Sequence, residues 1–284
     1  MPLAKNASKI RLRVRDALLT GKKATVRAEA QSPSDNVFHC CLHKTGSQWI
    51  RRIMKDYRVY RYSGLEAHHY QSAMPGGHDP RPVNARVFSE PFPARTIVTP
   101  LYIDYPGYRA IPKPESSRAF FMTRDPRDIV VSWYFSSKLS HRLMGDLHDV
   151  RGSLSDLDEV EGLEYSIRHL EGFGLFEAQR SWIDSESDAA ALVVRFEELA
   201  GADSVAHFRK LFDHCRIALP DSVLEEVLDA YSFERLSGRA KGVEDVNTHF
   251  RKGIQGDWRN HFVPEVEAVF EKVTGDLVHS LGYA

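Results

Sequence analysis

A lysine and several small polar residues separate an apolar segment from a helical pattern near residue 40. Residues 37–42 are mostly apolar and predict a buried strand, and hydrophobic side chains over residues 49–57 recur at helical spacing. Backbone N–H groups and the dipole at a helix N-terminus favour a bound anion, and Lys44 adds a full positive charge. We therefore expect a phosphate or sulfate group at residues 43–47, the anion-binding turn, although a plain strand-to-helix turn fits the same residues.

The anion-binding turn is not a Walker A loop. That motif places two glycines before its lysine and a serine or threonine directly after it. Here Lys44 precedes Gly46, the only glycine of the turn.

A second strand-turn-helix pattern covers residues 120–134. Arg124 lies at the expected strand end, and Ser132 follows eight residues later, about two helical turns along. The planar guanidinium group matches phosphate oxygens, and serine offers a hydroxyl. The alternative is that Arg124 and Arg127 form ion pairs with the aspartates beside them, which would not exclude phosphate binding.

A third segment, residues 250–260, is the basic loop. Arg251 and Lys252 precede Gly253, whose backbone can approach an oxyanion closely. Alone, this pattern is also typical of a solvated loop. Three basic turns in one chain predict a ligand with more than one phosphate-like group.

The three segments resemble, in the same order, the signature of the cytosolic-type sulfotransferases, which use 3′-phosphoadenosine-5′-phosphosulfate (PAPS). Residues 43–49 are similar to the P-K-S-G-T-T-W loop around the 5′-phosphosulfate. Arg124 and Ser132 match the family's residues on the 3′-phosphate, and residues 251–258 are similar to its R-K-G-x-x-G-D-W run. Residues 231–233 resemble the T-S-F segment, whose aromatic ring stacks on adenine.

The resemblance implies an enzyme that transfers a sulfuryl group from PAPS to a hydroxyl or amine of a small-molecule acceptor, without a metal. It implies a P-loop-like, three-layer α/β fold with a central parallel sheet flanked by helices, which the alternation of strand and helix patterns also predicts. Lys44 would act on the leaving phosphate. Cofactor binding is assigned to Lys44, Thr45, Gly46, Ser47, Gln48, Trp49, Arg124, Ser132, Phe196, Phe233, Arg251, Lys252 and Gly253.

The chain departs from the family pattern at the general base. The family has K-T-H at the end of the strand between the first two motifs, whereas residues 95–104 contain neither histidine nor lysine, and Pro100 stands at the histidine position. Asp104, just past this strand, is our first candidate for the base, and His69 is the second. Both are also typical of structural residues.

Two further departures concern adenine and assembly. Phe196 replaces the tyrosine of the family's Y-E-D-[LM] run, so a phenol hydrogen bond is lost while stacking is retained. The dimerisation motif K-x-x-x-T-V-x-x-x-E is not matched in residues 259–268, which leaves the oligomeric state open.

Two other functions fit part of the pattern. A P-loop kinase would need Mg²⁺ and the Walker A order of residues. A non-catalytic module could bind PAPS without the missing base, because a fold and its motifs do not guarantee activity.

Composition limits the partners and the location. Lys and Arg number 38 against 39 Asp and Glu, a balance that argues against nucleic-acid binding. Three cysteines without framework spacing predict reduced thiols in a cytoplasmic protein. The sequence shows no leader-like segment and no apolar stretch of membrane-spanning length, so we expect no membrane span.

The chain divides into a basic N-terminal extension, residues 1–35, and a single domain, residues 36–284. The extension could form a short amphipathic helix, although a mobile terminus is favoured. Within the domain we expect irregular loops at 72–93 and 145–164, a strand at 190–196, helices at 205–212 and 222–230, and a last helix that begins at Pro264.

Overall fold

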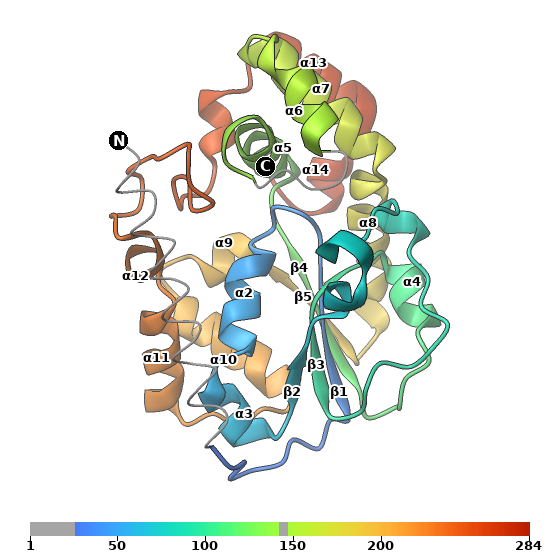
Figure 1. Ribbon diagram of the computed structural model, residues 1–284, viewed down its shortest axis with the longest axis vertical. Helices are drawn as coiled ribbons and strands as arrows, with labels where there is room; N and C mark the ends of the chain where they lie inside the picture. The colour runs from blue at the N-terminus through green and yellow to red at the C-terminus, as the bar shows by residue number, and fades with distance from the viewer. Residues whose placement is uncertain (1–25, 142–146) are drawn as a thin grey trace.

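The protein contains one parallel β-sheet of five strands. The computed structural model describes residues 26–141 and 147–284, and the strands occur in the order β2-β3-β1-β4-β5 (Figure 1). Their bounds are Asn36–Cys41 for β1, Glu66–His68 for β2, Thr96–Tyr102 for β3, Arg118–Thr123 for β4 and Ala191–Arg195 for β5. Because all the pairings are parallel, the carboxyl ends of the strands meet at one edge.

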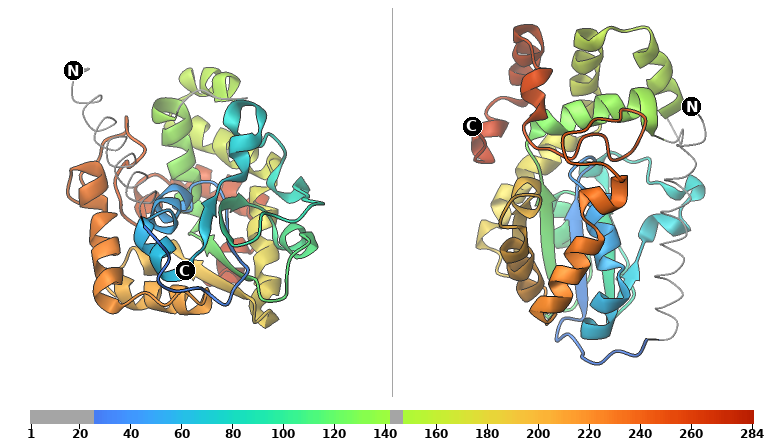
Figure 2. Two further views of the ribbon diagram at one scale, coloured as in Figure 1. Left: turned by 60° about the horizontal axis from the view of Figure 1, so that its bottom comes forward. Right: turned by 90° about the vertical axis from the view of Figure 1, so that its left-hand side faces the viewer.

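Helices cover both faces of this sheet, which confirms the three-layer α/β prediction. One face packs against α2 (Ser47–Met54), α3 (Tyr57–Ser63), α9 (Phe196–Leu199), α10 (Ser204–His214), α11 (Asp221–Ala230) and α12 (Phe233–Ser237). The other face packs against α4 (Tyr105–Ala110) and α8 (Leu175–Ser181). The same apolar core continues past the carboxyl edge of the sheet into α5 (Pro126–Phe135), α6 (Leu147–Ser155), α7 (Glu159–Gly172), α13 (Pro264–Thr274) and α14 (Leu277–Ser280) (Figure 2, right).

Strand β1 lies at the centre of the sheet and is buried along its whole length. Cys40 belongs to the core on the α5 face and Cys41 to the core on the α2 face, as expected from the alternation of side chains in a strand. A strand that is buried on both faces reads as a continuous apolar run rather than as an alternating one, which explains the pattern at residues 37–42.

The predicted irregular segment at 72–93 is confirmed, apart from short 3₁₀ turns at Tyr70–Ala73, Pro75–Gly77 and Val83–Ala85. Its anchor is Arg86, a buried arginine. The Arg86 guanidinium donates to the backbone oxygens of Tyr102 and Asp79, both at 3.1 Å. This contact ties the segment to the end of β3.

The predicted loop at 145–164 is wrong, because the structure has α6 and α7 there. The Asp158 side chain accepts from the Glu161 backbone N–H, and the Glu161 side chain accepts from the Asp158 backbone N–H. This capping box fixes the start of α7. Val150, Leu154 and Leu163 bury their side chains in the core, which the many acidic residues of the segment obscured.

The other predicted elements are confirmed with small differences. The strand at 190–196 is β5, and the helices at 205–212 and 222–230 are α10 and α11. Pro264 opens α13, but α14 follows after Gly275, so α13 is not the last helix.

Part of the N-terminal extension lies outside the described residues. Residues 26–35 are described, and Arg95 holds them through bonds from its guanidinium to the backbone oxygens of Ser32 and Ser34. The amphipathic helix falls within residues 1–25 and stays a prediction, as does the domain boundary at residue 35. Among the described helices, none combines the length and apolar character that a membrane crossing needs.

Candidate functional site

A cavity of about 340 Å³ lies at the carboxyl edge of the sheet. Order along the sheet reverses at β1, between β3 and β4, and open α/β sheets bind ligands at such switch points. The segment that follows α12 crosses this edge (Figure 2, right). The anion-binding turn, the residues after β4 and β5, and the basic loop therefore meet around one space.

Most of the predicted cofactor residues line this cavity. They are Lys44, Gly46, Ser47, Gln48, Trp49, Arg124, Ser132, Phe196, Phe233, Arg251, Lys252 and Gly253. Thr45 does not line it, because its side chain is buried and donates to the backbone oxygen of Leu42 at 2.9 Å. Thr45 therefore braces the turn from below.

The anion-binding turn is built from two left-handed residues. Lys44 has φ 68° and Gly46 has φ 92°. A Cβ at Gly46 would lie 2.8 Å from Met122 and 2.9 Å from Phe196, so only glycine fits. Helix α2 then begins without a side-chain cap, which leaves its first backbone N–H groups for a ligand.

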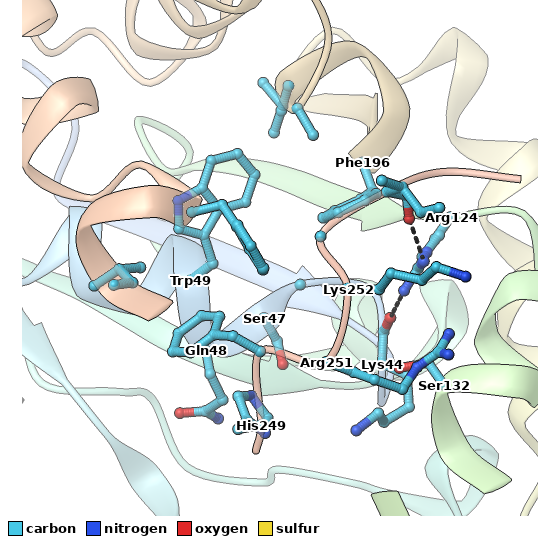
Figure 3. Close-up of a pocket in the computed structure, with 18 of the residues that line it drawn as sticks. Lys44, Ser47, Gln48, Trp49, Arg124, Ser132, Phe196, His249, Arg251 and Lys252 are labelled. Carbon is cyan, nitrogen blue, oxygen red and sulfur yellow. Dashed lines mark hydrogen bonds between the residues drawn. The ribbon is translucent and has the colours of Figure 1, made fainter. Parts of the chain in front are cut away.

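Arg124 lies at the end of β4 and points into the cavity (Figure 3). Its terminal nitrogens donate to the backbone oxygens of Lys44 and Ile254, both at 3.3 Å, so it joins the turn to the basic loop. Its charge lies 4.6 Å above the centre of the Phe196 ring. The Nε atom is buried and has no partner among the described residues, which leaves donor capacity for an oxyanion.

The arginines of this segment also form the ion pairs with neighbouring aspartates that the sequence suggested as an alternative. Arg127 pairs with Asp125 at 2.8 Å, and Arg124 with Asp128 at 3.4 Å. Asp128 further accepts from the backbone N–H groups of Gly256 at 2.7 Å and Trp258 at 3.0 Å. Helix α5 thus holds the basic loop in place, and the ion pair leaves Arg124 at the cavity.

Asp257 organises the cations of the basic loop. It pairs with Arg251, and with Lys252 at 2.6 Å. Burial opposes ionisation of Asp257, but the contacts of its carboxylate with His261, Lys252, Asn260 and Arg251 outweigh it and hold its pKa well below the usual range. The carboxylate therefore fixes both cations beside the cavity at all ordinary pH values.

Aromatic side chains form the wall opposite the cations. The Trp49 ring meets Phe196 edge-on at 6.0 Å, and its Nε1 donates to the backbone oxygen of Tyr231 at 2.9 Å. A Cβ at Gly253 would lie only 2.4 Å from Phe233. Gly253 therefore allows the basic loop to pack against the Phe233 ring. The sequence pattern does not reveal this reason for a glycine at the position.

The electrostatics of the cavity favour an anion. Burial, and then the charges of Arg124 and Arg251, lower the pKa of Lys44 to about 7. An anion between these groups would offset their repulsion and return the proton to Lys44.

Adenosine 3′,5′-bisphosphate is the desulfonated form of the PAPS that the resemblance implies, and its binding at about pH 8 is therefore expected to take up a proton. Lys44 would be mostly neutral before binding and charged afterwards, so affinity should fall as the pH rises above about 7. Calorimetry in buffers of different ionisation enthalpy measures the uptake. Lys44→Met should abolish it, and a wild-type protein that takes up no proton would contradict the lowered pKa.

The two candidate bases do not lie at the cavity. Asp104 caps α4, where its carboxylate accepts from the Gly107 backbone N–H at 2.9 Å, so it serves its own helix. The His69 ring lies 3.3 Å from Arg51 and 2.9 Å from Ser72, in a separate pocket. The structure thus gives neither residue access to the reacting group, and the expectation of a base at either position lacks geometric support.

Several other cavity residues were missed from sequence. The four closest in chemistry to a catalytic role are His43, Tyr102, His141 and His249. The Tyr102 hydroxyl lies 3.0 Å from the Ser47 hydroxyl and accepts from the Gln48 amide at 3.1 Å, so it braces the anion-binding turn from β3. His43 could have been noticed because it precedes Lys44, but the place of Tyr102 beside it depends on strand order.

The comparisons with known proteins agree with this geometry. The family profile described as "Sulfotransferase domain" matches residues 109–282, more than half of the chain. Mouse sulfotransferase 2A2 is 30% identical over 169 residues, which cover 55% of this chain and 55% of the relative. Mouse sulfotransferase 2B1 is 24% identical over 179 residues, which cover 58% and 49%. The chain spans about half the length of these curated relatives.

Solved structures show the same fold. Mouse sulfotransferase SULT7A1, complexed with PAP, aligns with a TM-score of 0.58 and 17% identity over 92% of this chain and 88% of that one. Retinol dehydratase, complexed with androsterone and the inactive cofactor PAP, aligns with a TM-score of 0.56 and 16% identity over 87% and 81%. The chain belongs to the sulfotransferase family.

Proposed function

We propose that this protein transfers a sulfuryl group from PAPS to a hydroxyl or amine of a small-molecule acceptor. The observation that carries the proposal is the meeting of Lys44, Arg124 and Arg251 with an aromatic wall around one cavity. Separated cations suit a ligand with two anionic ends, and aromatic rings suit a base between them.

Each end of the cofactor has a natural place in this arrangement. The anion-binding turn would hold the 5′-phosphosulfate through Lys44 and the N–H groups of α2. Arg124, Ser132 and Arg251 would hold the 3′-phosphate, and Lys252 and Gly253 would close the loop over it. Adenine would stack between Trp49 and Phe233, with Phe196 nearby.

The chemistry proposed is an in-line displacement at sulfur. The acceptor forms a bond to sulfur while the bond from sulfur to the bridging oxygen breaks, and negative charge builds on the leaving phosphate. The positive charge of Lys44 stabilises this developing negative charge. A fixed cation in a site that excludes water lowers the barrier more than it would in water.

Replacement of Phe233 by alanine is expected to raise the Michaelis constant for PAPS about two- to tenfold, because stacking contributes about 0.5–1.5 kcal/mol beyond area burial. Steady-state kinetics measures it, with Tyr62→Ala, a change at a half-buried aromatic residue of α3 that does not line the cavity, as the matched control. An unchanged Michaelis constant for PAPS in the Phe233→Ala variant would show that adenine does not stack on this ring.

The proposal includes independence from metal ions and a cytoplasmic location. Among the described residues, no three His, Cys, Asp or Glu side chains are grouped to hold a metal. The three cysteines are buried and unpaired, in keeping with a reducing compartment.

The proposed reaction is tested by incubating the protein with labelled PAPS and a chelator, in the presence of a panel of alcohols, phenols and amines. We expect labelled product with the chelator present. Transfer from ATP that requires Mg²⁺ would instead favour a kinase, and tight PAPS binding without transfer would favour a non-catalytic module.

A further inference from the structure

We propose that His43 is the catalytic base of this protein, accepting the proton of the acceptor hydroxyl; the inference rests on the proposed function. An alcohol that attacks sulfur must lose its proton, and a positioned side chain is the usual acceptor. Asp104 and His69 lie elsewhere, so the base must come from the titratable groups that line the cavity.

Most of these groups have another role or position. The Tyr102 hydroxyl already binds Ser47 and Gln48, and burial raises its pKa to about 12, so the phenol stays protonated. Glu234 follows Phe233 on α12, at the aromatic end. His141 and His249 also line the cavity, but their side chains are more exposed than that of His43, which leaves their ring positions less fixed.

His43 lies where β1 and β3 both end. Cys41 of β1 is in register with Tyr102 of β3, so the residue two positions beyond Cys41 reaches across Tyr102. The His43 ring stacks on the Tyr102 ring at 4.4 Å and 7°, and Phe173 meets it edge-on at 5.3 Å. Two aromatic rings thus fix the plane of the imidazole, directly before Lys44 in the chain.

The ring nitrogens of His43 differ in their surroundings. Nδ1 is buried without a hydrogen-bond partner among the described residues. Nε2 is not buried and makes no hydrogen bond with the described residues, so it is open to the cavity that His43 lines. Burial, and then the charges of Arg86 and Lys44, lower the pKa of His43 to about 3, so the imidazole is neutral but weakly basic before an anionic cofactor binds. A neutral imidazole has one nitrogen that can accept a proton.

The acceptor O–H bond breaks and its proton passes to Nε2 of His43 as the oxygen–sulfur bond forms. The bond between sulfur and the bridging oxygen breaks, and its electron pair leaves with the phosphate beside Lys44. The imidazolium then returns the proton to water, and adenosine 3′,5′-bisphosphate departs.

This role is tested by comparing the rates at which the His43→Gln and His43→Asn variants transfer the sulfuryl group to acceptors of different acidity. An alcohol needs a base, whereas a nitrophenol that is ionised at the assay pH does not. We expect a loss of about a hundredfold or more with the alcohol, within the usual range for general base catalysis, and less than about tenfold with the ionised phenol. His148→Gln, an exposed change on α6, should leave both rates unchanged.

Affinity for adenosine 3′,5′-bisphosphate reports whether each variant is folded. Should both variants fail to fold, the wild-type protein is treated with diethyl pyrocarbonate, and peptide mass spectrometry identifies the modified histidine. Alcohol transfer should then fall in step with modification of His43, while phenolate transfer persists.

Three results would overturn the assignment: full alcohol transfer by the His43 variants, equal losses with both acceptors, or a loss that tracks modification of His141 or His249. Each of these results still leaves the proposed function intact, because each can be observed only if the wild-type protein transfers sulfate. A wild-type protein that transfers to no acceptor would instead refute the proposed function itself.

Discussion

Replacement of Lys44 by alanine is expected to lower turnover about a hundred- to a thousandfold, the range seen when one fixed electrostatic group is removed from a transition state. Its charge matters most when the leaving oxygen becomes negative, so affinity for adenosine 3′,5′-bisphosphate should fall far less. Steady-state kinetics and calorimetry on the same preparations separate the two effects.

The backbone at Lys44 supplies a matched pair of variants. With φ at 68°, alanine keeps the strained left-handed conformation and glycine relieves it. Lys44→Gly should therefore be more stable than Lys44→Ala while losing the same turnover, and Lys272→Ala, exposed on α13, should change neither. Normal turnover combined with poor cofactor affinity would make Lys44 a binding residue only.

Replacement of Arg124 by alanine is expected to weaken PAPS and adenosine 3′,5′-bisphosphate to the same degree, about ten- to a hundredfold. Hydrogen bonds to a charged group contribute about 1.5–3 kcal/mol, and each 1.4 kcal/mol is a factor of ten. Calorimetry measures both ligands.

Arg124 also holds Lys44 and Ile254 through their backbone oxygens, so the loss could arise from a displaced loop. Adenosine 5′-phosphosulfate, which lacks the 3′-phosphate, resolves this point. Its affinity should hardly change in Arg124→Ala if the contact is direct. Arg168→Ala, an exposed change on α7, is the control. Unchanged affinity for both 3′-phosphorylated ligands would show that Arg124 does not bind the 3′-phosphate.

The sequence predicts which segments meet at the cavity, because their signals are local. The anion-binding turn, Arg124 at the end of β4 and the basic loop each carry their motif within a few residues. Parallel strands then bring their carboxyl ends together, so local patterns suffice to predict a shared cavity.

The proposed acceptor side depends on contacts that no local pattern encodes. Asp104 is an acid at a strand end, yet Pro106 and Gly107 after it are typical of a helix start, where aspartate caps. His43 meets Tyr102 only because β1 and β3 are neighbours in register. Likewise, the capping box at Asp158 could have corrected the loop expected at 145–164.

A single-turnover experiment tests the central claim most directly. Purified protein in excess over ³⁵S-labelled PAPS is mixed with the acceptor panel, and the label is followed by chromatography. We expect the label to leave PAPS and appear in an acceptor in one exponential phase, which Lys44→Ala slows about a hundredfold or more. Label that stays on bound PAPS in the wild-type protein, with every acceptor class, would contradict the account.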